Sequence, residues 1–121
     1  MTAPHVRIAC AAALTAVAAC VWAHAFIHHA VPAVGSTVHG SPPELRIAFT
    51  EELEPAFSGV KVEDAQGKSI VDAPKAVDAS DRMLLRVALP PLAPGKYRVV
   101  WRVLSVDSHV TQGDFTFAVV E

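Results

Sequence analysis

Cysteine is nearly absent from this chain, and both copies lie close to its start. Cys10 and Cys20 are the two cysteines among 121 residues. The sequence after residue 20 therefore contains no thiol, which excludes a disulfide framework and cysteine-bound metal from most of the chain. Any fold formed there has to be stabilised by its apolar core alone.

Excess positive charge is also lacking. The chain has 10 lysines and arginines against 12 aspartates and glutamates, for a formal net charge of −2. The basic residues form no run or stripe of the kind that follows a phosphate backbone. We therefore expect no nucleic-acid partner.

The uncharged run near the N-terminus is too short for a membrane span. Ile8 to Ala23 is uncharged for 16 residues, whereas a spanning helix needs roughly 20. A basic residue, Arg7, precedes the run, and Val21 and Ala23 stand at −3 and −1 of a cleavage site. We predict a secretory signal peptide over residues 1–23 and a mature, exported domain over residues 24–121.

The mature protein could also begin at either of two other residues. The segment Val17-Ala-Ala-Cys20 resembles a bacterial lipobox, which would leave a lipidated Cys20 at the start of the mature protein. Cleavage after Ala25 would instead remove His24. Each alternative changes the chemistry of the mature N-terminus.

The rest of the sequence has the period-2 alternation of β-strands. Gly- and Pro-containing segments such as residues 32–40 and 90–95 separate the runs, and no helical period is sustained; residues 51–57 allow at most one helical turn. Such spacing predicts an all-β fold, an immunoglobulin-like sandwich or Greek-key β-barrel, with a cupredoxin-like topology as an alternative. The expected strands cover residues 24–31, 44–49, 57–64, 83–89, 96–105 and 114–120.

Asp107 and His109 stand one residue apart between the last two expected strands. By themselves they are typical of a solvated turn. If cleavage makes His24 the first residue, however, its α-amine and imidazole can chelate one metal ion, and both lose their protons easily near neutral pH. Nitrogen and oxygen donors in this combination suit Cu(II), with His109 and Asp107 completing a four-coordinate set.

Three segments resemble the CopC family of periplasmic copper-binding proteins: HAFIHHAVPAVGS (24–36), LRIAFTE (45–51) and YRVVWRVLSVDSHVTQGDFTF (97–117). The resemblance implies a Greek-key β-barrel that binds one Cu(II) per chain in the periplasm. It implies that His24, Asp107 and His109 are the Cu(II) ligands, and that Glu51 lies close to the copper. It also suggests a CopD-like inner-membrane protein as a partner.

Two residues depart from what the family usually has. Ser108 stands between Asp107 and His109, where glycine is usual, and a serine would be strained there if the position requires a positive φ. Many members carry a methionine-rich Cu(I) site, but Met83 is the single methionine after residue 23. Because Cu(I) requires several soft ligands, we expect no Cu(I) site and assign Met83 to the core.

Three further histidines and one tyrosine have simpler interpretations. Strand alternation places His28 on the face of His24 and His29 on the opposite face. One of them could offer a secondary metal contact, but exposed or edge-strand histidines are the simpler interpretation. His39 is expected in a solvated loop. Tyr97 follows a Pro-Gly turn, as a tyrosine corner would, but an ordinary strand aromatic is the simpler interpretation.

The leading hypothesis is a monomeric, exported carrier that holds Cu(II) for copper resistance or homeostasis and passes it to a membrane protein; it is not an enzyme. One alternative is a copper redox enzyme, since an N-terminal histidine brace also occurs in oxidative polysaccharide-cleaving enzymes. The other is a metal-free immunoglobulin-like interaction module.

Overall fold

The computed structural model describes residues 25–121, which form nine strands and one short 3₁₀ turn. His24 and the expected signal peptide lie outside the described residues. The elements are β1 (Ile27–Val31), β2 (Thr37–His39), β3 (Glu44–Phe49), η1 (Pro55–Phe57), β4 (Gly59–Glu63), β5 (Ser69–Ala73), β6 (Val77–Asp78), β7 (Asp81–Ala88), β8 (Gly95–Leu104) and β9 (Val110–Val120).

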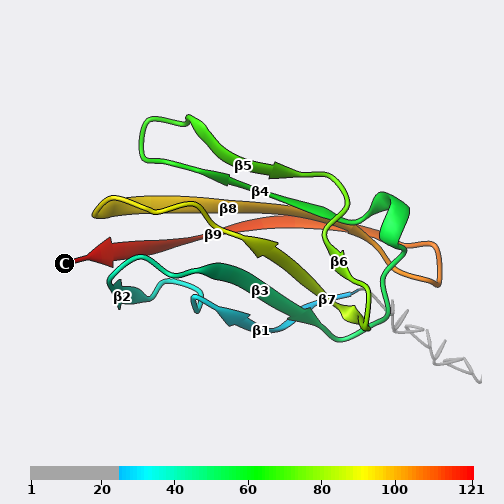
Figure 1. Ribbon diagram of the computed structural model, residues 1–121. Helices are drawn as coiled ribbons and strands as arrows, with labels where there is room; N and C mark the ends of the chain where they lie inside the picture. Colours follow the sequence, from blue (N-terminus) through cyan, green and yellow to red (C-terminus); the bar gives the residue numbers. More distant parts are fainter. Residues whose placement is uncertain (1–24) are drawn as a thin grey trace, which may run out of the picture.

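The strands form two sheets packed face to face (Figure 1). One sheet has the order β1-β3-β7-β6 and the other the order β2-β9-β8-β4-β5. All neighbouring pairs are antiparallel except β2 and β9, which run parallel. The predicted all-β, two-sheet fold is therefore confirmed.

The core lies between the sheets and comes from alternate residues of the long strands. β8 and β9 pair over ten residue pairs, and their odd-numbered positions point inward. Phe49 from β3 meets Trp101 from β8 edge to face, with ring centroids 5.2 Å apart, and Tyr97 stacks on Phe117 at 5.6 Å. The Phe49–Trp101 contact joins the two sheets, whereas the Tyr97–Phe117 stack lies within the five-stranded sheet and stabilises the β8–β9 hairpin.

Short edge strands were not expected from the sequence. β2 lies in the segment assigned to a Pro- and Gly-containing connector, and β6 lies between two of the expected strands, where no strand was expected. β5 was also missed. Each has five residues or fewer, so little alternation is available to reveal it.

Three predictions about single side chains were wrong. Met83 is 38% exposed, whereas its neighbours Leu84 and Leu85 are buried. Phe57 belongs to η1 and not to a strand, and it is 67% exposed. The Tyr97 hydroxyl donates a hydrogen bond to the Ala93 carbonyl at 2.6 Å, which is the backbone contact of a tyrosine corner.

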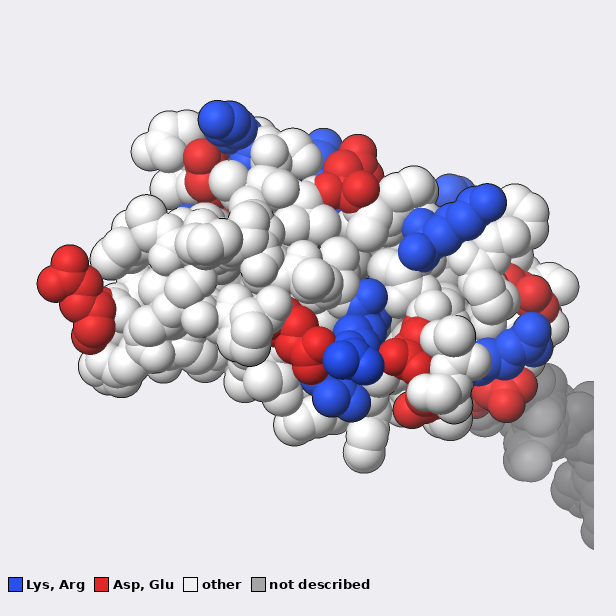
Figure 2. Space-filling view, viewed as in Figure 1, with Lys and Arg blue, Asp and Glu red and all other residues white. Residues whose placement is uncertain are grey.

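Charges of both signs are mixed on the surface. Figure 2 shows lysine and arginine side chains next to aspartate and glutamate on the visible face, with wide uncharged areas between them. Arg86, for example, pairs with Glu44 at 2.8 Å and with Asp78 at 3.5 Å. No helix formed by residues 25–121 has the length and apolar character that a membrane crossing requires.

Candidate metal centre

The connection between β8 and β9 spans residues 105–109; we call it the neck. Leu104 pairs with Val110 as the last pair of the ladder, so the neck is a tight turn fixed to the two longest strands. Within it, the Nδ1 atom of His109 lies 3.2 Å from the Oδ2 atom of Asp107. The structure thus brings together the two side chains that the sequence singled out.

This spacing fits two ligands of a single ion. Ligand atoms bound at ~2.0–2.1 Å lie roughly 2.8–3.4 Å from each other, from square to tetrahedral geometry. Both side chains are about one-third exposed, at 36% for His109 and 35% for Asp107. Each side chain is therefore partly open to solvent, although the Nδ1 atom of His109 is itself buried.

Ser105 forms hydrogen bonds within the neck that position its backbone and the Asp107 carboxylate. It is completely buried, and its hydroxyl donates a hydrogen bond to Asp107 Oδ1. Its oxygen also lies 3.1 Å from the His109 carbonyl, and its backbone N–H donates to that same carbonyl at 3.0 Å. One buried side chain thus holds both candidate ligands in place.

The electrostatics of the neck favour an ionised carboxylate. The hydrogen bond from Ser105 is the largest influence that lowers the pKa of Asp107 below its ordinary value, and the His109 ring and backbone N–H act in the same direction. Desolvation opposes these effects. Asp107 therefore stays charged, and able to bind a cation, at any pH near neutrality.

The first described residues lie against the neck. The Thr111 hydroxyl donates a hydrogen bond to the Ala25 carbonyl at 3.0 Å, and Ala25 is completely buried. Phe26 exchanges two hydrogen bonds with Thr50, at 2.9 and 3.0 Å. Figure 1 shows the start of the described chain at the same end of the sandwich as the β8–β9 connection.

The two residues next to Glu51 in the chain are both hydrogen-bonded at this end of the molecule. Its neighbour Thr50 is bonded to Phe26, and the carbonyl of Glu52 accepts a hydrogen bond from Val106 in the neck at 3.0 Å. Glu51 itself is half-buried. Its backbone is thus near the neck, but residues 25–121 contain no group of three or more histidine, cysteine or acidic side chains placed to hold a metal ion. Glu51 does not join Asp107 and His109 in such a group, and the role that the resemblance gives it stays a prediction.

Ser108 has the positive backbone φ that its place in the usual glycine position suggested. Its φ is 72°, in the left-handed region where residues with a Cβ are strained. Its backbone N–H donates to the Ser105 carbonyl at 2.9 Å, which closes the turn. This turn therefore requires a positive φ at the position where the family usually has glycine.

Sequence reasoning missed Ser105 and Thr111. Both continue the inward-facing odd positions of β8 and β9, where their neighbours are apolar. A hydroxyl at an inward position needs a buried hydrogen-bond partner, and this was the available signal. The partners turn out to be the neck itself and the Ala25 carbonyl.

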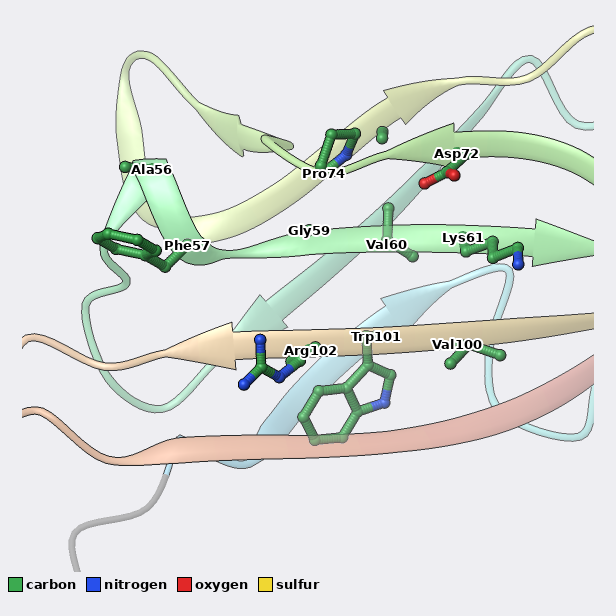
Figure 3. Close-up of a pocket in the computed structure, with 11 residues that line it drawn as sticks. Ala56, Phe57, Gly59, Val60, Lys61, Asp72, Pro74, Val100, Trp101 and Arg102 are labelled. Atoms are coloured by element: carbon green, nitrogen blue, oxygen red, sulfur yellow. The ribbon is translucent and has the colours of Figure 1, made fainter.

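A shallow depression of about 360 Å³ lies on the outer side of the five-stranded sheet. Figure 3 shows Phe57 at one end of it, Lys61 and Val100 at the other, and Arg102 beside Trp101. Two cationic side chains face a single carboxylate there, that of Asp72. The depression therefore repels a metal cation, and the neck is the better candidate.

Comparison with known proteins identifies the family of the chain. Residues 27–120 match the CopC domain. The chain belongs to the CopC family. It is 39% identical over 100 residues to Protein YobA of Escherichia coli K12, covering 82% of this chain and 81% of that protein.

Two solved CopC-family structures are also similar. CopC from Methylosinus trichosporium OB3b has 35% identity and a TM-score of 0.74, with 79% of this chain and 93% of that chain covered. PcoC from Escherichia coli, described as a methionine-rich copper resistance protein, has 30% identity and a TM-score of 0.70, with 81% and 100% covered. The family predicted from the three sequence segments is therefore confirmed.

Proposed function

We propose that this CopC-family protein is an exported carrier that binds one Cu(II) ion at the neck. The proposed ligands are the α-amine and imidazole of His24, the carboxylate of Asp107 and the imidazole of His109, with Glu51 nearby. The carrier acts in copper resistance or homeostasis in the periplasm, and a CopD-like inner-membrane protein receives the metal. It is a monomer and not an enzyme.

The hydrogen bond from Thr111 to the Ala25 carbonyl carries this proposal. Ala25 is the residue after His24, and Thr111 is two residues after His109. Consecutive Cα atoms are ~3.8 Å apart, so a chain that begins at His24 begins next to the neck. The two halves of a four-coordinate site then meet at one end of the sandwich.

The names of the relatives support copper as the ion. PcoC is described as a copper resistance protein, and a nitrogen-rich site with one carboxylate suits Cu(II) better than harder cations. PcoC is also described as methionine-rich, whereas this chain has two methionines. We therefore propose Cu(II) binding without a methionine-based Cu(I) site.

Intact mass of the protein purified from the periplasm, without and with one equivalent of Cu(II), tests the proposal. A mass that begins at His24 and increases by one copper is expected. A mass that begins at Phe26, or a lipidated Cys20, would contradict the amine–imidazole chelate.

The His109→Ala variant tests the neck directly. It removes one nitrogen ligand from an exposed turn, so Cu(II) affinity should fall by orders of magnitude while the melting temperature of the metal-free protein is retained. His39→Ala is the matched control, because His39 lies on β2 with its Nδ1 3.1 Å from the Glu121 carbonyl. Equal affinities of the two variants would refute the site.

The rival functions make different predictions. A copper redox enzyme should turn over ascorbate and oxygen continuously, whereas a carrier with a filled equatorial plane should not. A metal-free module should show no thermal shift with copper. For the carrier, ligand at 100 times its Kd adds about 2.7 kcal/mol to the stability of the folded state.

A further inference from the structure

Two adjacent histidines on β1, His28 and His29, are both exposed. The strand is half-buried at Ile27, exposed at His28 and His29, and buried again at Ala30. Regular alternation would have placed His28 and His29 on opposite faces, as the sequence suggested. The burial pattern departs from that alternation.

A β-bulge is the cause. Ile27 pairs with Phe49 and His29 pairs with Ala48, so β1 advances two residues while β3 advances one. Phe49 faces the core, and Ala48 lies on the outer face of β3. His28 is the extra residue, and a bulge of this kind sets two side chains opposite a single partner residue.

The position of the bulge leaves both imidazoles accessible. β1 is the edge strand of the four-stranded sheet, so its outer side has no neighbouring strand within residues 25–121. The small side chain opposite the pair, that of Ala48, does not cover it. The nearest arginine on β3, Arg46, is paired with Val31 in the ladder and forms an ion pair with Glu44 at 3.5 Å.

We propose that His28 and His29 form a second metal site that takes a divalent d-block cation, Cu(II) above all. Adjacent Cα atoms are ~3.8 Å apart, so two exposed imidazoles can close on one ion, with water completing its coordination. Imidazole nitrogen is the commonest protein ligand for such ions, and Cu(II) stands at the top of the affinity order. With two protein ligands, the site is weaker than a four-ligand neck site.

The second site lies close to the neck. His28 is three positions after Ala25, and an extended segment of that length spans at most roughly 10–11 Å. An ion held by the histidine pair is thus near the place where the proposed carrier site begins. Together with the proposed neck site, the histidine pair gives the chain a capacity of two metal ions. Binding at the pair itself does not depend on the neck being a metal site.

Cu(II) titration by calorimetry, with electron paramagnetic resonance of the bound ion, tests the inference. The protein is purified from cells that express the full chain, and its mass is measured first. We expect one tight and one weaker equivalent, the weaker with nitrogen hyperfine structure from imidazole. His28→Ala/His29→Ala should lose the weaker equivalent alone, and His39→Ala should retain both.

The single variants guard against an effect of the double substitution on folding. His28→Ala and His29→Ala should each weaken the second event by roughly tenfold or more, since even outer-shell partners of a metal contribute 10- to 100-fold. Unchanged binding in the double variant would overturn the inference. So would loss of the weaker event in His39→Ala, or a stoichiometry of half an equivalent, which indicates an ion shared between two chains.

The same titration separates this inference from the proposed function. His109→Ala should lose the tight event and keep the weaker one. A wild-type protein with the weaker event but without a tight one would refute the neck site and leave the histidine pair standing. A tight event without a weaker one would refute the pair and leave the carrier standing.

Discussion

Replacing Ser108 with glycine should make the protein more stable, because the neck holds this serine at a φ of 72°. A residue with a Cβ in the left-handed region costs roughly 1–2 kcal/mol relative to its ordinary conformation. Glycine avoids that cost but loses roughly 0.5–1 kcal/mol of backbone entropy on folding. Ser108 is exposed, so removing its side chain sacrifices little packing.

The difference leaves Ser108→Gly about 0.5–1 kcal/mol more stable than the wild type. For a domain of this size, that corresponds to a rise in melting temperature of roughly 2–8 °C. Thermal denaturation of the metal-free protein, followed by circular dichroism, measures it. Urea denaturation gives an independent value of the same free energy of unfolding.

Ser108→Ala is the matched control. Alanine removes the hydroxyl but keeps the Cβ, so its strain persists and its melting temperature should stay close to that of the wild type. If Ser108→Gly is no more stable than Ser108→Ala, the left-handed turn does not strain the neck, and the argument from φ is refuted.

Three other substitutions test separate parts of the structure. Ser105→Ala removes the hydroxyl that holds Asp107, so Cu(II) affinity should fall by roughly 10- to 100-fold. Calorimetry measures this affinity. Retained affinity would show that the hydroxyl does not position the carboxylate. Asp78 has a lowered pKa, chiefly through the hydrogen bond from the Ser80 hydroxyl, so its stabilising effect is present above pH ~4 and lost as pH falls through the folded-state pKa. Asp78→Asn should therefore melt lower than the wild type at pH 7, with a gap that closes in acid; a constant gap from pH 7 to pH 2 would contradict the linkage. Gly59→Ala places a Cβ 2.5 Å from a backbone oxygen at the end of β5, so it should destabilise the fold by about 1–3 kcal/mol or more, and an unchanged denaturation midpoint would mean that β5 moves aside freely.

The long strands could be predicted because each has one buried and one exposed face. In β3, Leu45, Ile47 and Phe49 alternate with polar or small residues, and the strand begins and ends where the alternation does. β8 and β9 show the same pattern over ten and eleven residues. The short strands β2, β5 and β6 have too few residues to show it, and β2 in addition pairs with β9, which is distant in the sequence.

The two candidate ligands of the neck could be predicted from their spacing, but the hydroxyls that support this end of the molecule could not. Asp107 and His109 carry recognisable metal chemistry, whereas the hydroxyls of Ser105 and Thr111 acquire their roles from partners that only the folded structure supplies. The bulge at His28 was beyond reach for the same reason, since a bulge is a relation between two strands and leaves no mark on either one alone.

The contact between Thr111 and Ala25 also bears on when the proposed metal site could form. These residues are 86 positions apart in the chain, so the hydrogen bond between them requires the last hairpin to be in place. In a chain whose β9 is unpaired, the proposed ligands would not be brought together. If the neck binds copper as proposed, the metal would therefore bind only after β8 and β9 have paired, and its binding would report that the domain has folded.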